Sequence, residues 1–203
     1  MENTLRQRVT EAIPSLIAGA LLLLLANTGA LGTPPPDFSL RDTDGRIHSP
    51  KEWKLKRAVV LVFVTVDCPI TNSYVPELNR IDADYAPRGV EVFAVQGDAT
   101  QKAETLRGYA KEYAYTFPLL LDPNLTLAKW TGATTMPEAA VLSPSGEVLY
   151  LGRIDDRYID FGKQRPQAKQ HDVRDALNAL LSGKPIPEAR TRALGCAISG
   201  KTI

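Results

Sequence analysis

The chain has 203 residues, of which 44% are hydrophobic and 23% are charged. This composition is that of an ordinary globular protein and excludes a wholly disordered or fibrous chain. Lys and Arg number 24 against 23 Asp and Glu, a formal net charge of +1, which gives no electrostatic reason to expect a nucleic acid or an acidic membrane as partner. The two cysteines, Cys68 and Cys196, exclude a disulfide-dense scaffold and a four-thiolate zinc site.

Residues 1–30 have the pattern of a secretory signal peptide. The apolar run from Leu16 to Ala26 is shorter than the roughly 20 residues that span a membrane. Two arginines precede it, and small residues at 28–30 offer a cleavage site. We therefore predict an exported protein, periplasmic or secreted, in which a disulfide can persist. An uncleaved N-terminal membrane anchor is the alternative.

Apolar periodicity and turn signals predict alternating strands and helices from residue 37 to residue 183. The predicted elements are a hairpin over 37–47, a short helix with a capping box at 49–52, a strand over 58–66, a helix over 69–85 bent at Pro76, a strand over 90–95, a helix over 103–113, a strand over 117–121, a short helix over 125–130, strands over 138–142 and 147–152, and a helix capped by Asp172 over 172–181.

The order of these elements defines the expected architecture. The nearly unbroken apolar run over 58–66 predicts a central strand that is buried on both faces. Parallel crossovers come first and an antiparallel hairpin last, which predicts an α/β sandwich in one domain over 31–183. Residues 184–203 are too polar for a core element, so we expect a C-terminal tail on the surface.

Cys68 stands where the buried strand ends and the next helix begins, directly before Pro69. A sulfur at this place faces the unpaired N–H groups and the positive dipole end of the helix. That field favours the thiolate and lowers the pKa of a cysteine, whereas the carboxylate of the adjacent Asp67 acts in the opposite direction. The position predicts a reactive thiolate, and an inert buried cysteine is the alternative.

Three other residues are candidates for the same site. Thr65 precedes Cys68 by three residues, so its hydroxyl is a candidate hydrogen-bond partner for a thiolate or a peroxide oxygen. Met136 and Pro137 lie just before a predicted strand. A cis bond there would turn the preceding carbonyl and amide toward a bound peptide, and an ordinary trans turn is the alternative.

These residues together resemble the redoxin branch of the thioredoxin fold, which contains the alkyl hydroperoxide reductases and thiol-specific antioxidants. The resemblance rests on Pro36-Asp37-Phe38-Ser39-Leu40, Thr65-Val66-Asp67-Cys68-Pro69, Pro76 and Thr135-Met136-Pro137. Segments 152–156 and 195–198 are similar to a peroxiredoxin-like subgroup. The resemblance implies a thioredoxin-like α/β sandwich with a mixed central sheet, an N-terminal β-hairpin extension, and a C-terminal helix plus tail.

The resemblance also implies thiol–disulfide or thiol–peroxide chemistry at Cys68. Thr71 occupies the position of the second cysteine of thioredoxins, so no vicinal disulfide can form. Leu61 stands where peroxiredoxins have a proline, and Arg153 is the nearest candidate for their distant arginine. No organic cofactor is implied, because sulfur itself carries the electrons and another thiol protein supplies the reductant.

Cys196 is open to three interpretations. It can be the resolving thiol that attacks an oxidised Cys68. It can form a permanent bridge with Cys68, which would close a loop of about 130 residues and stabilise the fold by roughly 5 kcal/mol. The third possibility is a copper(I) site completed by His171 or His48.

We predict an exported thiol oxidoreductase whose partner is a thiol or disulfide protein or a peroxide. Neither a nucleic acid nor, for the mature domain, a membrane is expected as partner, and no metal site is predicted. The alternative is a non-catalytic binding module of the same fold that docks a partner protein or a copper ion. The candidate site residues are, for catalysis, Cys68, Thr65 and Cys196, and, for partner binding, Pro137, Met136 and Pro69.

Overall fold

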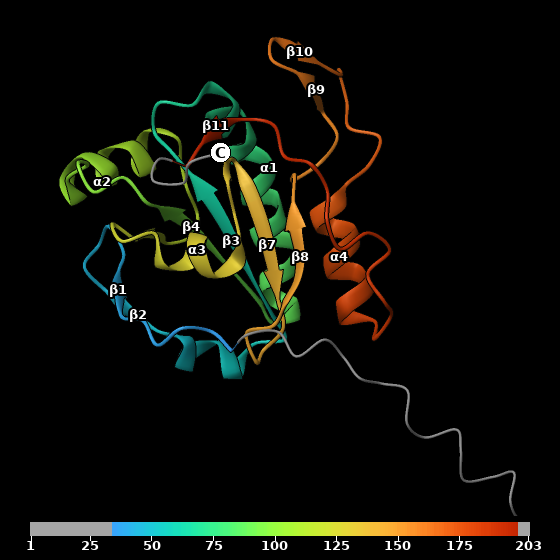
Figure 1. The fold of residues 1–203 in the computed structure, drawn as a ribbon, viewed down its shortest axis with the longest axis horizontal. Coiled ribbons are helices and arrows are strands. Elements are labelled where there is room, and N and C mark those ends of the chain that lie inside the picture. Colours follow the sequence, from blue (N-terminus) through green and yellow to red (C-terminus); the bar gives the residue numbers. More distant parts are fainter. Residues whose placement is uncertain (1–33, 199–203) are drawn as a thin grey trace, which may run out of the picture. The chain divides into compact units, whose positions relative to one another are not determined.

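A five-stranded mixed sheet with the strand order β5-β4-β3-β7-β8 forms the centre of the structure, a computed structural model that describes residues 34–198 (Figure 1). Strands β3 (Ala58–Val64), β4 (Val90–Gln96) and β5 (Leu119–Leu121) are parallel. Strand β7 (Glu138–Leu142) is antiparallel to β3, and β8 (Val148–Gly152) is antiparallel to β7. The mixed sheet of a thioredoxin-like sandwich is confirmed.

Strand β3 is buried along its whole length because both faces of the sheet are covered. Val60 and Val62 belong to one apolar cluster, whereas Leu61 and Phe63 belong to the other. This alternation follows from the period of two of a strand. The unbroken apolar run therefore corresponds to a strand that is buried on both faces, as the sequence predicted.

Helices cover the two faces of the sheet unequally (Figure 1). The first cluster contains buried side chains of α1 (Pro69–Tyr85), α2 (Ala103–Glu112) and α4 (Asp172–Leu181). The second contains those of the 3-10 helix η1 (Pro50–Leu55) and of α3 (Thr126–Thr131). A second 3-10 helix, η2 (Ala86–Arg88), follows α1, which runs through Pro76 without interruption.

Three pairs of short strands complete the described structure. Strands β1 (Leu40–Arg41) and β2 (Ile47–His48) form the predicted N-terminal hairpin. Strands β9 (Tyr158–Asp160) and β10 (Lys163–Gln164) form a second hairpin. Strand β6 (Thr135–Met136) pairs in antiparallel fashion with β11 (Cys196–Ala197), so the C-terminal segment returns to the residues that precede β7.

Two predicted helix caps are wrong in detail. Ser49 precedes η1 without a side-chain cap bond, and the Glu52 carboxylate accepts from the ring of His48 at 3.1 Å instead of closing a capping box. At α4 the cap residue is His171, whereas Asp172 is the first helical residue and pairs with Arg153. In each case a basic side chain nearby competes for the carboxylate.

The segment after residue 183 is more than a surface tail. Most of its described residues are exposed or half-buried, but Ile198 is only 3% exposed and packs in the second apolar cluster. The strand is two residues long, too brief for a periodic signal in the sequence. Its pairing with β6 becomes visible only in the folded chain.

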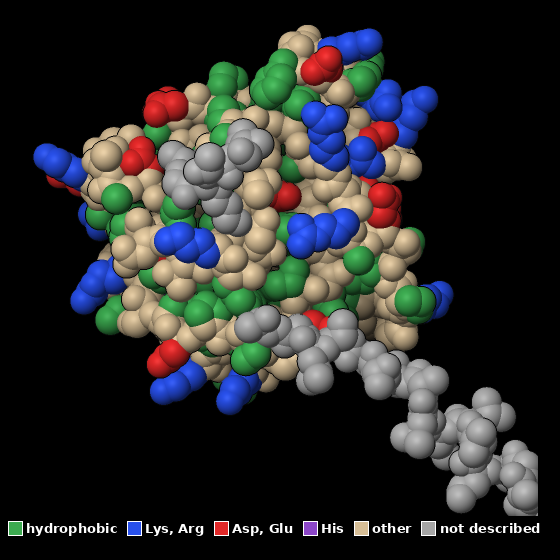
Figure 2. All heavy atoms as spheres, viewed as in Figure 1, with side chains coloured by type: hydrophobic (Ala, Val, Ile, Leu, Met, Phe, Trp, Pro, Cys, Tyr) green, Lys and Arg blue, Asp and Glu red, His purple; other side chains and the backbone are tan. Residues whose placement is uncertain are grey.

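The predicted signal peptide over 1–30 lies outside the described residues. Within residues 34–198, no helix combines the length and the apolar character needed to cross a membrane. On the face shown in Figure 2, basic and acidic side chains are interspersed.

Trp53 tests the packing of the second cluster. Its ring stacks on Trp130 with centroids 5.9 Å apart and packs against Phe38 at 5.3 Å, and it is 2% exposed. We expect Trp53→Ala to lower the free energy of unfolding by about 3–5 kcal/mol, because a large cavity is left in the core. Leu55 lies in the same 3-10 helix and is 88% exposed, so Leu55→Ala should cost less than about 0.5 kcal/mol. Equal losses in urea unfolding would contradict this packing.

Candidate active site

Cys68 is the residue that precedes α1, and Pro69 is the first residue of that helix. Proline is favoured there because its missing N–H would have no partner in the first turn. The backbone of Cys68 is extended, with φ −102° and ψ 109°, so its side chain lies at the amino end of the helix. The predicted location is therefore confirmed, but the side chain is only 1% exposed.

The neutral thiol of Cys68 makes no cap bond to the helix and instead donates to the backbone carbonyl of Met136 at 3.5 Å. On ionisation the sulfur becomes an acceptor. Burial raises its pKa, but the thiol of Cys196, the backbone N–H and hydroxyl of Thr71 and the backbone N–H of Cys196 outweigh that cost. Together they hold the pKa of Cys68 below its ordinary value.

Cys196 is the proton donor of the pair. Burial and the neighbouring Cys68 sulfur raise its pKa to about 11. Both cysteines are free in this structure. These two directions make Cys68 the more acidic thiol of the pair.

The strand pair of β6 and β11 brings the two sulfurs together. Cys196 lies opposite Met136 in the ladder, and the backbone N–H of Ile198 donates to the carbonyl of Thr134 at 2.9 Å. The Met136–Pro137 peptide bond is cis. In Figure 1 the red C-terminal segment crosses the end of the sheet toward which β3 points. The predicted partner-binding edge is therefore occupied by the chain's own C-terminal strand.

Glu138 shapes the segment that precedes Pro137. One of its carboxylate oxygens accepts from the backbone N–H groups of Thr134 and Thr135, at 2.7 and 3.1 Å. The side chain is buried, although Glu138 opens the central strand β7. This role was not predicted from the sequence, where the only signal is a carboxylate directly after the Met136-Pro137 pair.

A polar network from α2 supports the start of α1. The Asn72 amide donates to the carbonyl of Val66 at 3.4 Å, and the Tyr109 hydroxyl donates to the Asn72 side chain at 2.6 Å. Burial raises the pKa of Tyr109, and the nearby charge of Cys68 acts in the same direction. Because Tyr109 is 41 positions after Cys68 in the sequence, only the fold brings the two together.

The hydroxyl beside Cys68 belongs to Thr71, so the predicted pairing with Thr65 is wrong. In the described part of the chain, Thr65 makes no hydrogen bond to the sulfur. Thr65 precedes the helix, whereas Thr71 is the third residue of α1 and its N–H is one that an N-cap group normally accepts. The Thr71 hydroxyl is buried without a hydrogen-bond partner in this structure, and it is among the groups that lower the pKa of Cys68.

Leu61 and Arg153 stand at the two positions that bear on peroxide chemistry, and both make other contacts. Leu61 is fully buried in β3. The Arg153 guanidinium is held by the Asp172 carboxylate, with Nε–Oδ2 at 2.9 Å. Arg153 lines a small pocket together with Pro137, but its guanidinium is engaged by the first residue of α4.

Neither histidine joins the cysteines in a metal-binding cluster. The two ring nitrogens of His48 bind Asp42 at 2.9 Å and Glu52 at 3.1 Å, and His171 precedes α4. Among residues 34–198, no group of three or more His, Cys, Asp and Glu is arranged to hold a metal. The copper alternative therefore has no ligand set in this part of the chain.

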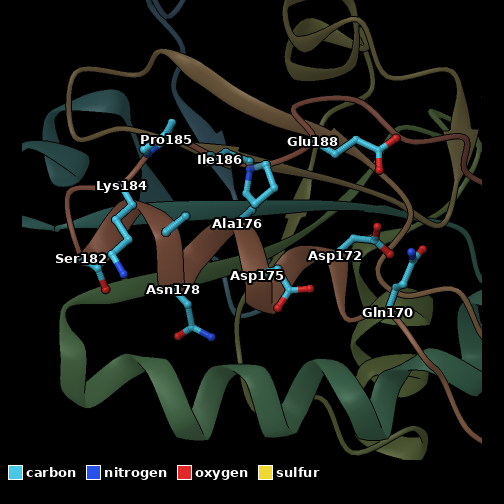
Figure 3. Close-up of a pocket in the computed structure, with 12 residues that line it drawn as sticks. Gln170, Asp172, Asp175, Ala176, Asn178, Ser182, Lys184, Pro185, Ile186 and Glu188 are labelled. Carbon is cyan, nitrogen blue, oxygen red and sulfur yellow. The ribbon is translucent and has the colours of Figure 1, made fainter.

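A groove of about 460 Å³ lies elsewhere, between α4 and the segment after it (Figure 3). Acidic side chains on its rim include Asp172, Asp175 and Glu188. None of the residues around Cys68 lines it. The redox chemistry is therefore expected at the covered sulfur pair and not in this groove.

A cysteine at the head of the first helix after the central parallel strand, beside a cis-proline segment, defines a thiol oxidoreductase of the thioredoxin fold. A family model supports the same conclusion. The chain belongs to the AhpC/TSA family, whose model matches residues 31–151. The match ends before Cys196, so the C-terminal strand lies outside the matched part.

One curated relative is named as a thiol oxidoreductase, and two solved structures share the fold. Over 119 residues the chain is 27% identical to the thiol-disulfide oxidoreductase ResA of Bacillus thuringiensis subsp. konkukian, covering 59% of this chain and 67% of that protein. An uncharacterized conserved protein from Geobacillus kaustophilus superposes with a TM-score of 0.74 and 31% identity, over 86% of this chain and 94% of that one. A thiol-disulfide oxidoreductase from Bacteroides fragilis shares the fold, with a TM-score of 0.51, 22% identity and coverage of 59% and 89%.

Thr71→Val tests the hydroxyl at the sulfur. The substitution removes a donor to the thiolate and keeps the shape of the side chain, so the pKa of Cys68 should rise by about 1. The rate of alkylation at Cys68, followed by peptide mass spectrometry across pH, should then reach its midpoint at higher pH. Thr65→Val is the matched control and should leave the midpoint unchanged. A shift in the control and none in Thr71→Val would restore the sequence-based assignment.

Proposed function

We propose that the protein is an exported thiol–disulfide oxidoreductase in which Cys68 attacks the partner and Cys196 resolves the mixed disulfide. The observation that carries the proposal is the pairing of β11 with β6, which sets the free Cys196 opposite Met136, the residue whose carbonyl accepts from the Cys68 thiol. The lowered pKa of Cys68 and the raised pKa of Cys196 support it. The lower pKa gives Cys68 the role of nucleophile, and the higher pKa keeps Cys196 protonated until the resolving step.

The reaction runs in two exchange steps. The Cys68 thiolate attacks one sulfur of a partner disulfide, whose S–S bond breaks and whose second sulfur leaves as a thiolate. That thiolate takes the proton of Cys196, which then attacks the Cys68 sulfur and releases the partner's remaining sulfur. The partner gains two electrons, and Cys68 and Cys196 become a disulfide. A dithiol protein restores the reduced pair by the same steps in reverse.

The surrounding residues bind and orient in this scheme. Pro69 starts the helix whose amino end faces the thiolate. Met136 and Pro137 form the edge along which a partner chain lies, and the Met136 carbonyl holds the neutral Cys68 thiol. Thr71 takes the role of thiolate donor in place of Thr65.

Disulfide exchange is favoured over peroxide reduction by the environment of Cys68. A peroxidase needs donors for the departing oxygen. The donors at this sulfur are those of Thr71 and Cys196, and the arginine suggested for a peroxide site is paired with Asp172. The groups in place stabilise a thiolate and present a second sulfur, which is what exchange requires.

Single cysteine variants separate the two roles. In an assay of insulin disulfide reduction with a dithiol reductant, Cys68→Ser should abolish turnover because the nucleophile is lost. Cys196→Ser should form a mixed disulfide with a partner peptide that persists under denaturing electrophoresis, because the resolving step is lost. Each variant should consume hydrogen peroxide no faster than a free thiol does.

Ser145→Ala is the control for these variants. Ser145 is exposed in the turn between β7 and β8, so its loss should leave turnover within about twofold of the wild-type rate. Full turnover by Cys68→Ser would overturn the proposal. Release of the partner from Cys196→Ser at the wild-type rate would remove Cys196 from the mechanism.

Export is proposed from the sequence pattern of residues 1–30. When the full chain is expressed with its own N-terminus in a bacterial host, we expect the protein in the periplasmic fraction. Its N-terminus should begin near residue 31, as read by intact-mass measurement. Retention of residues 1–30 with the protein in the membrane fraction would instead support the N-terminal anchor, and retention in the cytoplasm would contradict both.

A further inference from the structure

The buried position of Cys68 conflicts with its role unless something moves. A partner disulfide must approach the sulfur directly, but the side chain is 1% exposed. Thr71 and Cys196 both reach the sulfur, and they come from α1 and from β11. Helix α1 is fixed by seven buried side chains, whereas β11 is a two-residue strand that lies outside the five-stranded sheet. The movable cover is therefore β11.

Strand β11 is bound as a separate peptide would be. It pairs with β6 alone and takes no part in the five-stranded sheet. The pairing places a cysteine opposite Met136, the residue whose carbonyl accepts from the Cys68 thiol. A partner cysteine joined to Cys68 in a mixed disulfide needs this same place.

Gly195 shows how small the residue before the cysteine must be when a strand lies beside β6. A Cβ atom at that position would collide with the backbone oxygen of Met136 and press on the ring of Pro137. The φ of Gly195 is not in the left-handed region. The glycine is therefore required by the close approach of two backbones, and a larger residue in front of the cysteine would push the strand off β6.

Ile198 anchors the other end. Its side chain is 3% exposed and lies among Phe63, Val95 and Met136 in the second cluster. Between the two, Ala197 is exposed and imposes no such requirement. The surface that β11 occupies therefore favours a small residue before the cysteine and an aliphatic residue two positions after it.

We propose that β11 is an exchangeable ligand of the β6 edge and that partner polypeptides replace it as extended strands with the pattern small residue–Cys–any residue–aliphatic residue. This proposal rests on the proposed function and names its substrate class. Release of β11 exposes Cys68, and the partner strand then pairs with β6. After the first exchange step, return of β11 brings Cys196 to the mixed disulfide and displaces the partner from the edge.

The cover is tested by the alkylation rate of Cys68 in the full chain. Iodoacetamide is used above the ordinary cysteine pKa of about 8.5, so that loss of the Cys196 donor does not limit the thiolate. Ile198→Ser removes the anchor and should raise the rate by about tenfold or more. Ala197→Ser changes the exposed neighbour on the same strand and should leave the rate within about twofold.

Global loosening is distinguished from release of the strand by a second variant. Trp53→Ala destabilises the core without touching β11, so at equal or lower stability it should expose Cys68 less than Ile198→Ser does. If the two variants raise the rate in proportion to their loss of unfolding free energy, β11 is not a separate cover. An unchanged rate in Ile198→Ser would also overturn the proposal.

The partner pattern is tested with unreactive peptides on the Ile198→Ser chain. Blocked Leu-Gly-Ser-Ala-Ile in excess should slow alkylation of Cys68 toward the wild-type rate. Leu-Val-Ser-Ala-Ile and Leu-Gly-Ser-Ala-Ser should protect at least about tenfold less well, because the first clashes at the edge and the second lacks the anchor. Equal protection by all three, or protection by none, would overturn the selectivity.

These outcomes are independent of the redox assignment. Alkylation reports access to Cys68 whether or not the protein turns over a disulfide. An inactive wild type with a releasable strand would defeat the proposed function alone. Insulin reduction that is abolished in Cys68→Ser, together with a rate unchanged in Ile198→Ser, would defeat only the present inference.

Discussion

The pairing of β11 with β6 is the interaction on which the site depends. It places Cys196 opposite Met136 and against Cys68, covers the nucleophile and supplies two of the donors to its thiolate. A ladder of two residues contributes little by itself. The strand is held because Gly195 allows the two backbones to meet and Ile198 fills an apolar seat. The environment of the Cys68 sulfur thus depends on packing at Gly195 and Ile198, which lie one and two positions from Cys196.

Burial and acidity coexist at Cys68 because the buried sulfur is surrounded by donors. Removing an ion from water favours the neutral form. A hydrogen bond to a charged group is worth about 1.5–3 kcal/mol, and a change of one in pKa corresponds to about 1.4 kcal/mol. The several donors from Thr71 and Cys196 are therefore enough to offset the desolvation of a sulfur that keeps only slight exposure. The C-terminal strand supplies the donors from Cys196, and those from Thr71 belong to α1.

The parts predicted from the sequence are those with a strong local signal. The apolar run of β3 and the start of α1 at Pro69 are where the pattern placed them, because two-faced burial and proline geometry are encoded in adjacent residues. Cys68 could be found at their junction for the same reason. The order of the elements predicted parallel crossovers followed by an antiparallel hairpin, and the resemblance to redoxins implied the same mixed sheet.

The parts that were missed depend on long-range contacts. Thr65 and Thr71 lie three positions on either side of Cys68, and the sequence gives no reason to prefer the second until the helix turns its hydroxyl toward the sulfur. The carboxylates of Glu52 and Asp172 left their predicted caps for His48 and Arg153. Strand β11 is too short to show periodicity in the sequence, so its pairing with β6 is apparent only in the structure.

The large separation of Cys68 and Cys196 along the chain has a consequence for the oxidised state. A disulfide between these sulfurs would tie β11 covalently to the start of α1. The strand could then no longer leave β6, so oxidation would lock the same edge that reduction frees.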